Sequence, residues 1–345
     1  MHRIRTGRAA VLLGAAALLA AGCGAPGAGA GADVDRAGAL DLGVVPGAPA
    51  RPRNTAPFWV NPDGTAARQV SAYVRAGRAS EAALIKKIAK QPVGEWIGAD
   101  EPEEEAREFT EAAAQADRDA LLVVYNIPHR DCGQHSAGGA EDGAAYRDWV
   151  EQVARGIGER RATVILEPDA VMHMVDGCTE QSYQEERYAL LKAAVQRLKR
   201  QPHTTVYVDA GNAGWGRPEQ LTEPLRRAGI AQADGFAVNV SNFQTTEAST
   251  AYGKRLSTLI DGKPFVVDTS RNGNGPYTAG DPAENWCNPP GRALGRPPTT
   301  RTADPLVRAY LWIKRPGESD GACKGGPKAG DWFEPYALEL ARNAG

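Results

Sequence analysis

Acidic side chains follow a series of short apolar segments in this sequence. The acids in that position are Asp131, Asp169, Asp209, Asp268 and Asp320. Carboxyl groups that share a site can act as general acid and base when their surroundings hold their pKa values apart. Loops are polar in general, but loop polarity does not explain an acid beyond one apolar segment after another. We therefore predict that these acids gather in one catalytic site.

Tryptophans accompany the acids and indicate what the site acts on. Trp215, Trp286 and Trp312 lie in or beside the acidic segments. An exposed indole ring offers a flat apolar surface to the C–H face of a sugar ring, so this combination favours acid–base cleavage of a glycosidic bond. Other tryptophans lie within strand or helix patterns, and we expect them in the core: Trp59, Trp96 and Trp149.

Other features of the sequence argue against a serine hydrolase, a metal site, a nucleotide-binding loop and a nucleic-acid partner. Residues 317–321 match the G-x-S-x-G turn of serine hydrolases, but no helix pattern follows them and no histidine follows His203. The five histidines lack paired metal-ligand spacing, and Gly273 and Gly275 lack the context of a nucleotide-binding loop. The 40 Lys and Arg residues balance 42 Asp and Glu residues, which leaves no electrostatic footprint for nucleic acid. We predict no catalytic metal, no cofactor and no nucleic-acid partner.

Buried parallel strands are predicted from short apolar runs bounded by Gly and Pro. These runs span residues 58–60, 93–97, 121–127, 163–166, 205–208, 235–240, 265–267 and 309–313. Amphipathic stretches of helical length alternate with them, among them 103–116, 144–157, 184–198, 218–228 and 247–259. The alternation predicts an α/β fold, a closed or nearly closed (β/α) barrel of seven to eight parallel strands whose carboxyl ends share one face. An open doubly wound sheet is the alternative.

The N-terminal residues carry the pattern of an export signal and a tether. Residues 1–22 join a basic start to an apolar stretch too short to span a bilayer, which predicts a signal peptide. Small residues before Cys23 predict that this cysteine is lipidated and anchors the protein to the outer face of the cell membrane, with free secretion as the alternative. Residues 23–54, rich in Gly, Ala and Pro, predict a flexible tether, and residues 55–345 a single catalytic domain.

Four further cysteines, Cys132, Cys178, Cys287 and Cys323, fall in segments that follow predicted strands. An even number of cysteines in an exported protein favours disulfides, and four cysteines allow three pairings. We predict the sequential pairing, Cys132 with Cys178 and Cys287 with Cys323, because each bridge would then brace a loop at the predicted site. Reduced, buried cysteines are the alternative.

Several long motifs, in this order, resemble glycoside hydrolase family 6. They lie at residues 125–132, 134–139, 166–169, 209–215, 268–275, 285–287 and 311–321, and the resemblance extends from Pro57 to about residue 344. It is strongest to the bacterial secreted endoglucanases of that family. The resemblance implies a distorted β/α barrel that cleaves β-1,4-glucan with inversion at the anomeric carbon and without a metal.

The resemblance also implies roles for individual acids. Asp169 matches the family's general acid, and Asp131 matches the neighbouring carboxylate that raises its pKa. Asp320 matches the candidate base, whose attacking water can also pass its proton along a chain of waters. Asp209 matches an acid near the site whose role is less settled.

Further matches concern the substrate. Tyr125 matches the tyrosine that distorts the sugar ring at the point of cleavage. The matches to sugar contacts are Trp215, Trp286, Lys314 and Glu318. Asn212 stands where the family usually has histidine, and an amide forms hydrogen bonds but carries no charge, so affinity or pH response near Trp215 is expected to differ.

We therefore expect an exported, inverting endo-β-1,4-glucanase that acts as a monomer on cellulose, cello-oligosaccharides or a related β-glucan. The segments 178–186 and 320–332 are short, which favours an open cleft. An exo-acting cellobiohydrolase of the same family is one alternative. A cell-surface glucan-binding protein without catalysis is the other, and the intact set of Asp131, Asp169 and Asp320 argues against it.

Overall fold

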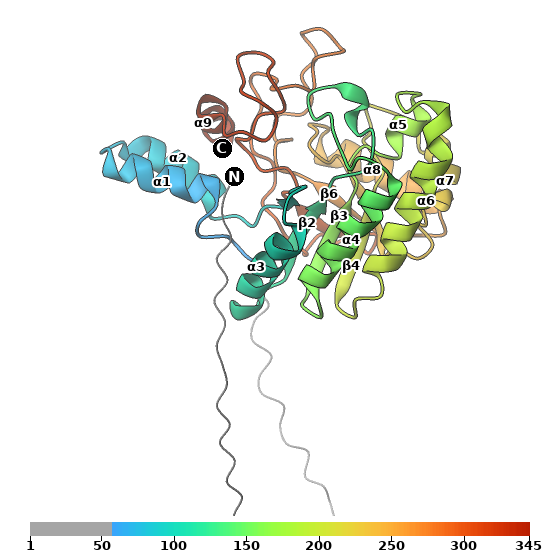
Figure 1. Ribbon diagram of the computed structural model, residues 1–345. Coiled ribbons are helices and arrows are strands. Elements are labelled where there is room, and N and C mark those ends of the chain that lie inside the picture. Colours follow the sequence, from blue (N-terminus) through green and yellow to red (C-terminus); the bar gives the residue numbers. More distant parts are fainter. Residues whose placement is uncertain (1–56) are drawn as a thin grey trace, which may run out of the picture. The chain divides into compact units, whose positions relative to one another are not determined.

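Seven parallel strands form one sheet in which every strand pairs with its neighbours in chain order (Figure 1). The computed structural model describes residues 57–345. The strands are β1 (Glu95–Ile97), β2 (Ala120–Val124), β3 (Ala162–Leu166), β4 (Thr204–Asp209), β5 (Gly235–Val238), β6 (Phe265–Asp268) and β7 (Val307–Leu311). This sequential order confirms the predicted distorted barrel, because a doubly wound sheet reverses its strand order at a switch point.

Alternating residues of each strand bury two separate apolar clusters. In β2, Leu121 and Val123 belong to the cluster inside the curled sheet, whereas Leu122 and Val124 belong to the cluster between the sheet and its helices. Every residue of β2 is buried, and the same holds for β3, β5 and β6. Burial on both faces explains why these strands read as continuous apolar runs in the sequence.

Helices cover the outer face of the sheet and form a further group beside it. The helices that pack on the outer cluster are α3 (Pro102–Gln115), α4 (Gly143–Ile157), α6 (Gln181–Leu198), α7 (Pro218–Arg227) and α8 (Thr246–Leu259). Met172 and Met174 of the one-turn α5 (Met172–Val175) also belong to the outer cluster, whereas α1 (Thr65–Arg75), α2 (Ala79–Ala89) and α9 (Glu334–Asn343) share a third apolar cluster. No helix in the described range is long and apolar enough to cross a membrane.

In the described part of the chain, no strand ladder joins the first strand, β1, to the last strand, β7. The N–H of Gly94 donates to the carbonyl of Trp312 at 2.9 Å, and the Arg315 side chain donates to the carbonyl of Gly94 at 2.9 Å. A Cβ at position 94 would lie 2.6 Å from the Ile313 carbonyl oxygen, so only glycine allows this approach. Arg315 also pairs with Glu95 at 2.9 Å. The Trp96 side chain also donates to the Ile313 carbonyl at 3.0 Å, so a backbone hydrogen bond, an indole and an arginine link the two edges where strand pairing stops.

One prediction about the elements is wrong. The run 58–60 forms no strand; Phe58 makes a single parallel bridge to Asp119, and the run is flanked by Pro57 and Pro62, which cannot donate a ladder hydrogen bond. Helices α1, α2 and α9 were not among the helices that the sequence analysis named. The predicted signal peptide, the tether and Cys23 lie outside the described residues.

Candidate active site

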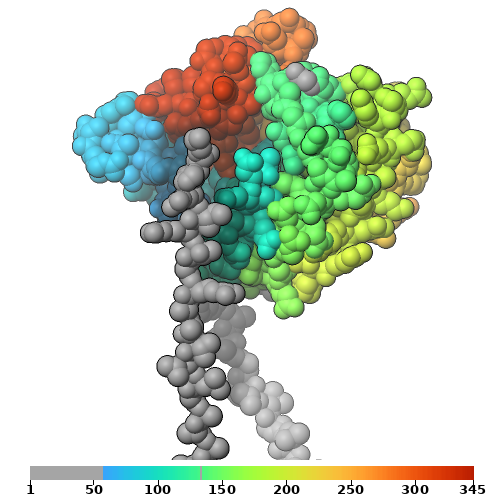
Figure 2. All heavy atoms as spheres, in the orientation of Figure 1, coloured from blue at the N-terminus to red at the C-terminus, as the bar shows by residue number. Residues whose placement is uncertain are grey.

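The predicted site residues come from the carboxyl ends of several strands, as a barrel requires. Tyr125 directly follows β2, Asp209 is the last residue of β4, and Asp169 lies three residues beyond β3. Lys314, Glu318 and Asp320 follow β7. In Figure 2 the segment after β7 (red), the segment around Trp286 (orange) and the loop after β2 (green) adjoin on the surface.

The backbone around the acids adopts the left-handed conformation at unusual positions. Asp131 has φ +53°, Glu167 +48° and Asp169 +69°, and none of them is glycine. A non-glycine residue in this region costs on the order of 1 kcal/mol and persists only where the surroundings enforce it. The strain falls on two of the predicted catalytic acids, which are therefore held in orientations that a relaxed loop would not adopt.

Asp169 lies in a cluster of carboxyl groups. Its N–H donates to the Asp209 carboxylate at 2.9 Å. Burial raises the pKa of Asp169 well above its usual range, and the negative charges of Asp209, Asp131 and Asp176 raise it further. Asp209 is buried, and burial raises its pKa to about 7 although three backbone N–H groups oppose the shift. Burial and the neighbouring charges thus favour the protonated form of Asp169, which is the form that a general acid needs.

The loop after β2 holds Asp131 and Tyr125 together. The Asp131 carboxylate accepts the N–H of Ser136 at 2.6 Å. Arg130 donates to the carbonyls of Ser136, at 2.9 Å, and Tyr125, and its guanidinium lies 4.7 Å from the centre of the Tyr125 ring. Burial raises the pKa of Tyr125 well above its usual range, and Asp169 and Asp131 add to the effect. The phenol is therefore a neutral hydrogen-bond donor beside the acids.

Glu167 is a buried residue of the site that the prediction missed as a functional group. Its carboxylate accepts N–H groups of Asn126, at 3.0 and 3.1 Å, and of Ile127, at 3.0 Å. Burial raises the pKa of Glu167 to about 7, against the effect of these hydrogen bonds. Glu167 thus ties the end of β3 to the backbone that follows Tyr125. The sequence feature that could have identified Glu167 is its position directly after the apolar run 163–166.

Asp320 lies in surroundings of the opposite charge. It is buried and accepts hydrogen bonds from Arg271 at 2.8 Å and from the N–H of Asn288 at 3.0 Å, with Lys314 Nζ at 3.6 Å. Burial alone would raise the pKa of Asp320, but Arg271 and Lys314 outweigh it and hold the pKa below its usual range. The opposite shifts of the two pKa values therefore open a pH range in which Asp320 is ionised while Asp169 is protonated.

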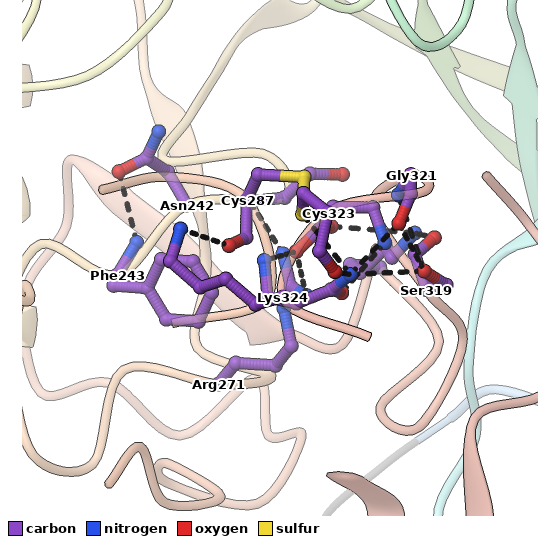
Figure 3. Close-up of polar contacts among 12 residues, drawn as sticks. Asn242, Phe243, Arg271, Cys287, Ser319, Gly321, Cys323 and Lys324 are labelled. Carbon is purple, nitrogen blue, oxygen red and sulfur yellow. Dashed lines mark hydrogen bonds and ion pairs between the residues drawn. A yellow bond between two sulfur atoms is a disulfide. The ribbon is translucent and has the colours of Figure 1, made fainter. Parts of the chain in front are cut away.

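Arg271 and Asn288 were also missed as members of the site. The guanidinium of Arg271 is fully buried and lies 4.4 Å from the centre of the Phe243 ring (Figure 3). The Asn288 side chain accepts the N–H of Asp320 at 2.9 Å and donates to the carbonyl of Gly321 at 2.9 Å. These contacts fix the Asp320 loop, and they depend on segments that only the folded chain brings together.

Two disulfides brace the loops of the site. The structure joins Cys132 to Cys178 and Cys287 to Cys323, the sequential pairing that the sequence analysis predicts, and Figure 3 shows the second bridge beside the Asp320 loop. His173 lies close enough to Cys132 and Cys178 for the three side chains to share a metal ion. Both sulfurs are used in the disulfide, however, and a closed bridge offers no thiolate ligand.

The predicted tryptophan platforms differ in exposure. Trp215 is half-buried and donates to the Asp176 carboxylate at 2.9 Å, and Trp286 is half-buried and donates to the Ala283 carbonyl at 2.9 Å. Trp312 is not a platform: it is buried in the cluster of α1, α2 and α9, where its N–H donates to the Arg296 carbonyl at 2.9 Å. The prediction that Trp312 is a platform was wrong, because its side chain, directly after β7, points toward these helices.

The other predicted sugar contacts are turned toward protein groups. Lys314 Nζ donates to the Ser319 carbonyl at 3.2 Å, and Glu318 pairs with Arg315 at 3.1 Å. Glu318 also lines a cavity of about 180 Å³ beside the barrel seam. Asn212 is buried, and its side-chain oxygen accepts the N–H of Gly214 at 2.9 Å. Asp131 and Asp209 thus lie near Asp169, and Lys314 lies near Asp320.

A parallel barrel with electrostatically opposed carboxyl groups at its strand ends has the features of a glycoside hydrolase that works by acid–base catalysis. The family model of glycosyl hydrolases family 6 matches residues 53–344. The chain belongs to this family.

Proteins named endoglucanases and a protein named a cellobiohydrolase are among the relatives of this chain. Endoglucanase A of Cellulomonas fimi is 43% identical over 297 residues, which are 85% of this chain and 62% of that protein. The structure of the endoglucanase Cel6 from Mycobacterium tuberculosis, in complex with a methyl-cellobiosyl-4-deoxy-4-thio-β-D-cellobioside, has a TM-score of 0.78 and 43% identity, and the match covers 84% of this chain and 97% of that one. The 1,4-beta-D-glucan cellobiohydrolase CEL6A of Pyricularia oryzae is 29% identical over 67% of this chain and 59% of its own length.

Proposed function

We propose that this protein is an inverting endo-β-1,4-glucanase that hydrolyses cellulose, cello-oligosaccharides or a related β-glucan. The observation that carries the proposal is the opposite electrostatics of two acids at the strand ends. Burial and neighbouring carboxylates raise the pKa of Asp169, whereas Arg271 and Lys314 lower that of Asp320. Inverting hydrolysis needs a protonated acid and an ionised carboxylate at the same pH.

The mechanism assigns one proton transfer to each acid. Asp169 donates its proton to the glycosidic oxygen as the bond from that oxygen to the anomeric carbon breaks. A water attacks the anomeric carbon from the opposite face, and its proton passes to Asp320, directly or through a second water. Asp131 keeps Asp169 protonated until the leaving group arrives. Tyr125, neutral and beside both acids, crowds the sugar whose bond is cleaved.

Substrate contacts are proposed on both sides of the point of cleavage. Trp215 and Trp286 each leave part of an indole ring exposed for stacking on a sugar. Lys314 and Glu318 would contact sugar hydroxyl groups after turning from their present partners. Asn212 and Asp209 would support the backbone beside Trp215. The endo mode rests on the greater similarity to proteins named endoglucanases than to one named a cellobiohydrolase.

Product analysis tests the proposed reaction. A single displacement yields the α-anomer first, and proton NMR of cellotetraose hydrolysis in its first minutes should record it. A β-anomer formed first would require a covalent intermediate and would overturn the roles of Asp169 and Asp320. Viscosity of carboxymethylcellulose should fall steeply per reducing end released; a small viscosity loss would indicate the exo mode, and no product at all a glucan-binding protein.

Replacing Asp131 with Asn should shift the pH dependence of the reaction. The charge of Asp131 raises the pKa of Asp169, so its removal lowers that pKa and Asp169 loses its proton at lower pH. The basic limb of the pH–rate profile for cellotetraose should move to lower pH, and the maximal rate should fall. Asparagine can still accept the Ser136 N–H, so the unfolding temperature should stay near that of the wild type. An unshifted basic limb would remove Asp131 as the modulator.

We propose that the protein is exported and anchored by a lipid on Cys23, with residues 1–22 removed and residues 23–54 as the tether. A lipidated cysteine followed by a tether would hold the catalytic domain away from the membrane surface. Cys23→Ala should move the protein from the membrane fraction to the medium or leave the precursor unprocessed. Identical fractionation of wild type and variant would contradict the anchor.

A further inference from the structure

Two aromatic side chains stack on the surface at the base of the loop that carries Asp131. His129 lies five residues beyond the end of β2, and Tyr183 lies in the first turn of α6. Their ring centroids are 4.0 Å apart and the ring planes differ by 24°. Both residues are exposed, and Tyr183 and Val74 are the exposed large apolar side chains of the described residues. The pair therefore presents flat ring surface to solvent.

The backbone of His129 is strained where a glycine would not be. Its φ is +56°, in the left-handed region, and Arg187 fixes the segment by donating to the carbonyls of Pro128 and His129, each at 2.9 Å. Glycine would adopt this conformation without the cost of a Cβ. The histidine ring is therefore carried by a backbone that Arg187 holds in position.

Only the outward ring surfaces are open to a ligand. The space behind the pair, lined by Ile127, Pro128 and Leu190 among others, is about 10 Å³ and holds one water at most. The stack and the Cys132–Cys178 bridge join the same two segments, because His129 lies three residues before Cys132 and Tyr183 five residues after Cys178. The stacked rings thus lie beside the loop of the proposed general-acid site. The disulfide and the ring stack both hold the two segments together.

We propose that His129 and Tyr183 form a secondary binding platform for β-1,4-glucan, on which a glucosyl ring stacks outside the catalytic site. The inference rests on the proposed function, since a polymer much longer than the site can contact the surface around it. Sugar rings present axial C–H groups that pack on aromatic faces. The platform would raise adsorption to insoluble polymer without taking part in the cleavage of short substrates.

Adsorption isotherms on insoluble cellulose test the platform. They use the full chain with Asp169→Asn, so that the polymer is not consumed. Tyr183→Ala and His129→Gly in that background should each weaken adsorption about two- to tenfold, the range of one aromatic contact. Val74→Ala, which removes an exposed apolar side chain on α1 without a stacked partner, is the matched control and should leave adsorption unchanged. His129→Gly should keep an unfolding temperature near that of its parent, because relief of strain offsets the added flexibility.

Cellotetraose turnover, measured with Asp169 intact, separates the platform from a structural role. Unchanged turnover in Tyr183→Ala and His129→Gly together with weaker adsorption would support the platform. Unchanged adsorption in both variants would overturn it, and so would a parallel loss of cellotetraose turnover, which would mean that the stack merely positions the Asp131 loop. A wild-type protein that adsorbs but does not cleave cellotetraose would instead refute the proposed function and leave the platform standing.

Discussion

Replacement of Asp169 with Asn should reduce hydrolysis of cellotetraose by about 10²- to 10⁴-fold, the usual contribution of a general acid. The departing sugar hydroxyl cannot leave as an anion, and an amide has no proton to give it. Asparagine has nearly the shape of aspartate, and the backbone N–H that donates to Asp209 remains in place. The folded structure should therefore persist, and circular dichroism and the unfolding temperature check this.

The leaving group supplies the control for that variant. A cellobioside of dinitrophenol departs without protonation, so Asp169→Asn should retain much of the wild-type rate on it. Asp131→Asn is the matched comparison, because it changes the pKa of the acid without removing the proton donor. Equal losses of Asp169→Asn on both substrates would show that Asp169 is not the acid, and would direct attention to Asp131 and Asp320.

Replacement of Asp320 with Asn should have the largest effect on stability. Asp320 and Arg271 form a buried ion pair whose side chains are 6% and 0% exposed, and loss of one partner leaves a buried charge without compensation. Such changes lower the free energy of unfolding by about 3–5 kcal/mol. Chemical denaturation should record this loss, and turnover of cellotetraose should fall by at least about 10²-fold because the negative charge opposite the acid is gone.

Two further variants separate the stability of that pair from its role in the reaction. Arg271→Gln combined with Asp320→Asn removes both charges and should recover part of the stability but none of the activity. Glu103→Gln breaks the exposed pair with Arg155, measured at 2.8 Å, and should leave the stability almost unchanged. If Asp320→Asn unfolds like the wild type, the pair contributes nothing to the fold; if it keeps full activity, Asp320 is not the base.

The barrel could be predicted because its strands are buried on both faces and its helices on one. Runs such as 121–127 and 163–166 contain residues of two apolar clusters and so read as continuous hydrophobic segments. Helix α1 was not predicted: Tyr73 is its single buried residue, and its partners in the third apolar cluster include residues of α9, at the other end of the chain. The run 58–60 has the composition of a strand, but pairing requires backbone donors on both sides of the run, and the flanking prolines lack them.

The acids of the site could be predicted because they follow strands, whereas their partners could not. The pKa of Asp320 depends on Arg271, which lies 49 residues away in the chain. The orientation of Trp312 depended on a layer of helices that its own neighbourhood does not encode. Sequence position thus indicates where an acid lies, and the charges around it, which set its pKa, come from the fold.

The apolar cluster of α1, α2 and α9 has a consequence for how the domain is made. Tyr73 and Ile85, on the first two helices, are buried against Tyr336 and Leu340 of α9, and the seam at Gly94 is closed by the segment that follows β7. The earliest helices to be synthesised must therefore wait for the latest one before their apolar faces are covered. Contacts so distant in sequence form slowly, and folding intermediates with uncovered helices are prone to associate. The period before α9 emerges is when a nascent chain of this protein most needs protection by a chaperone.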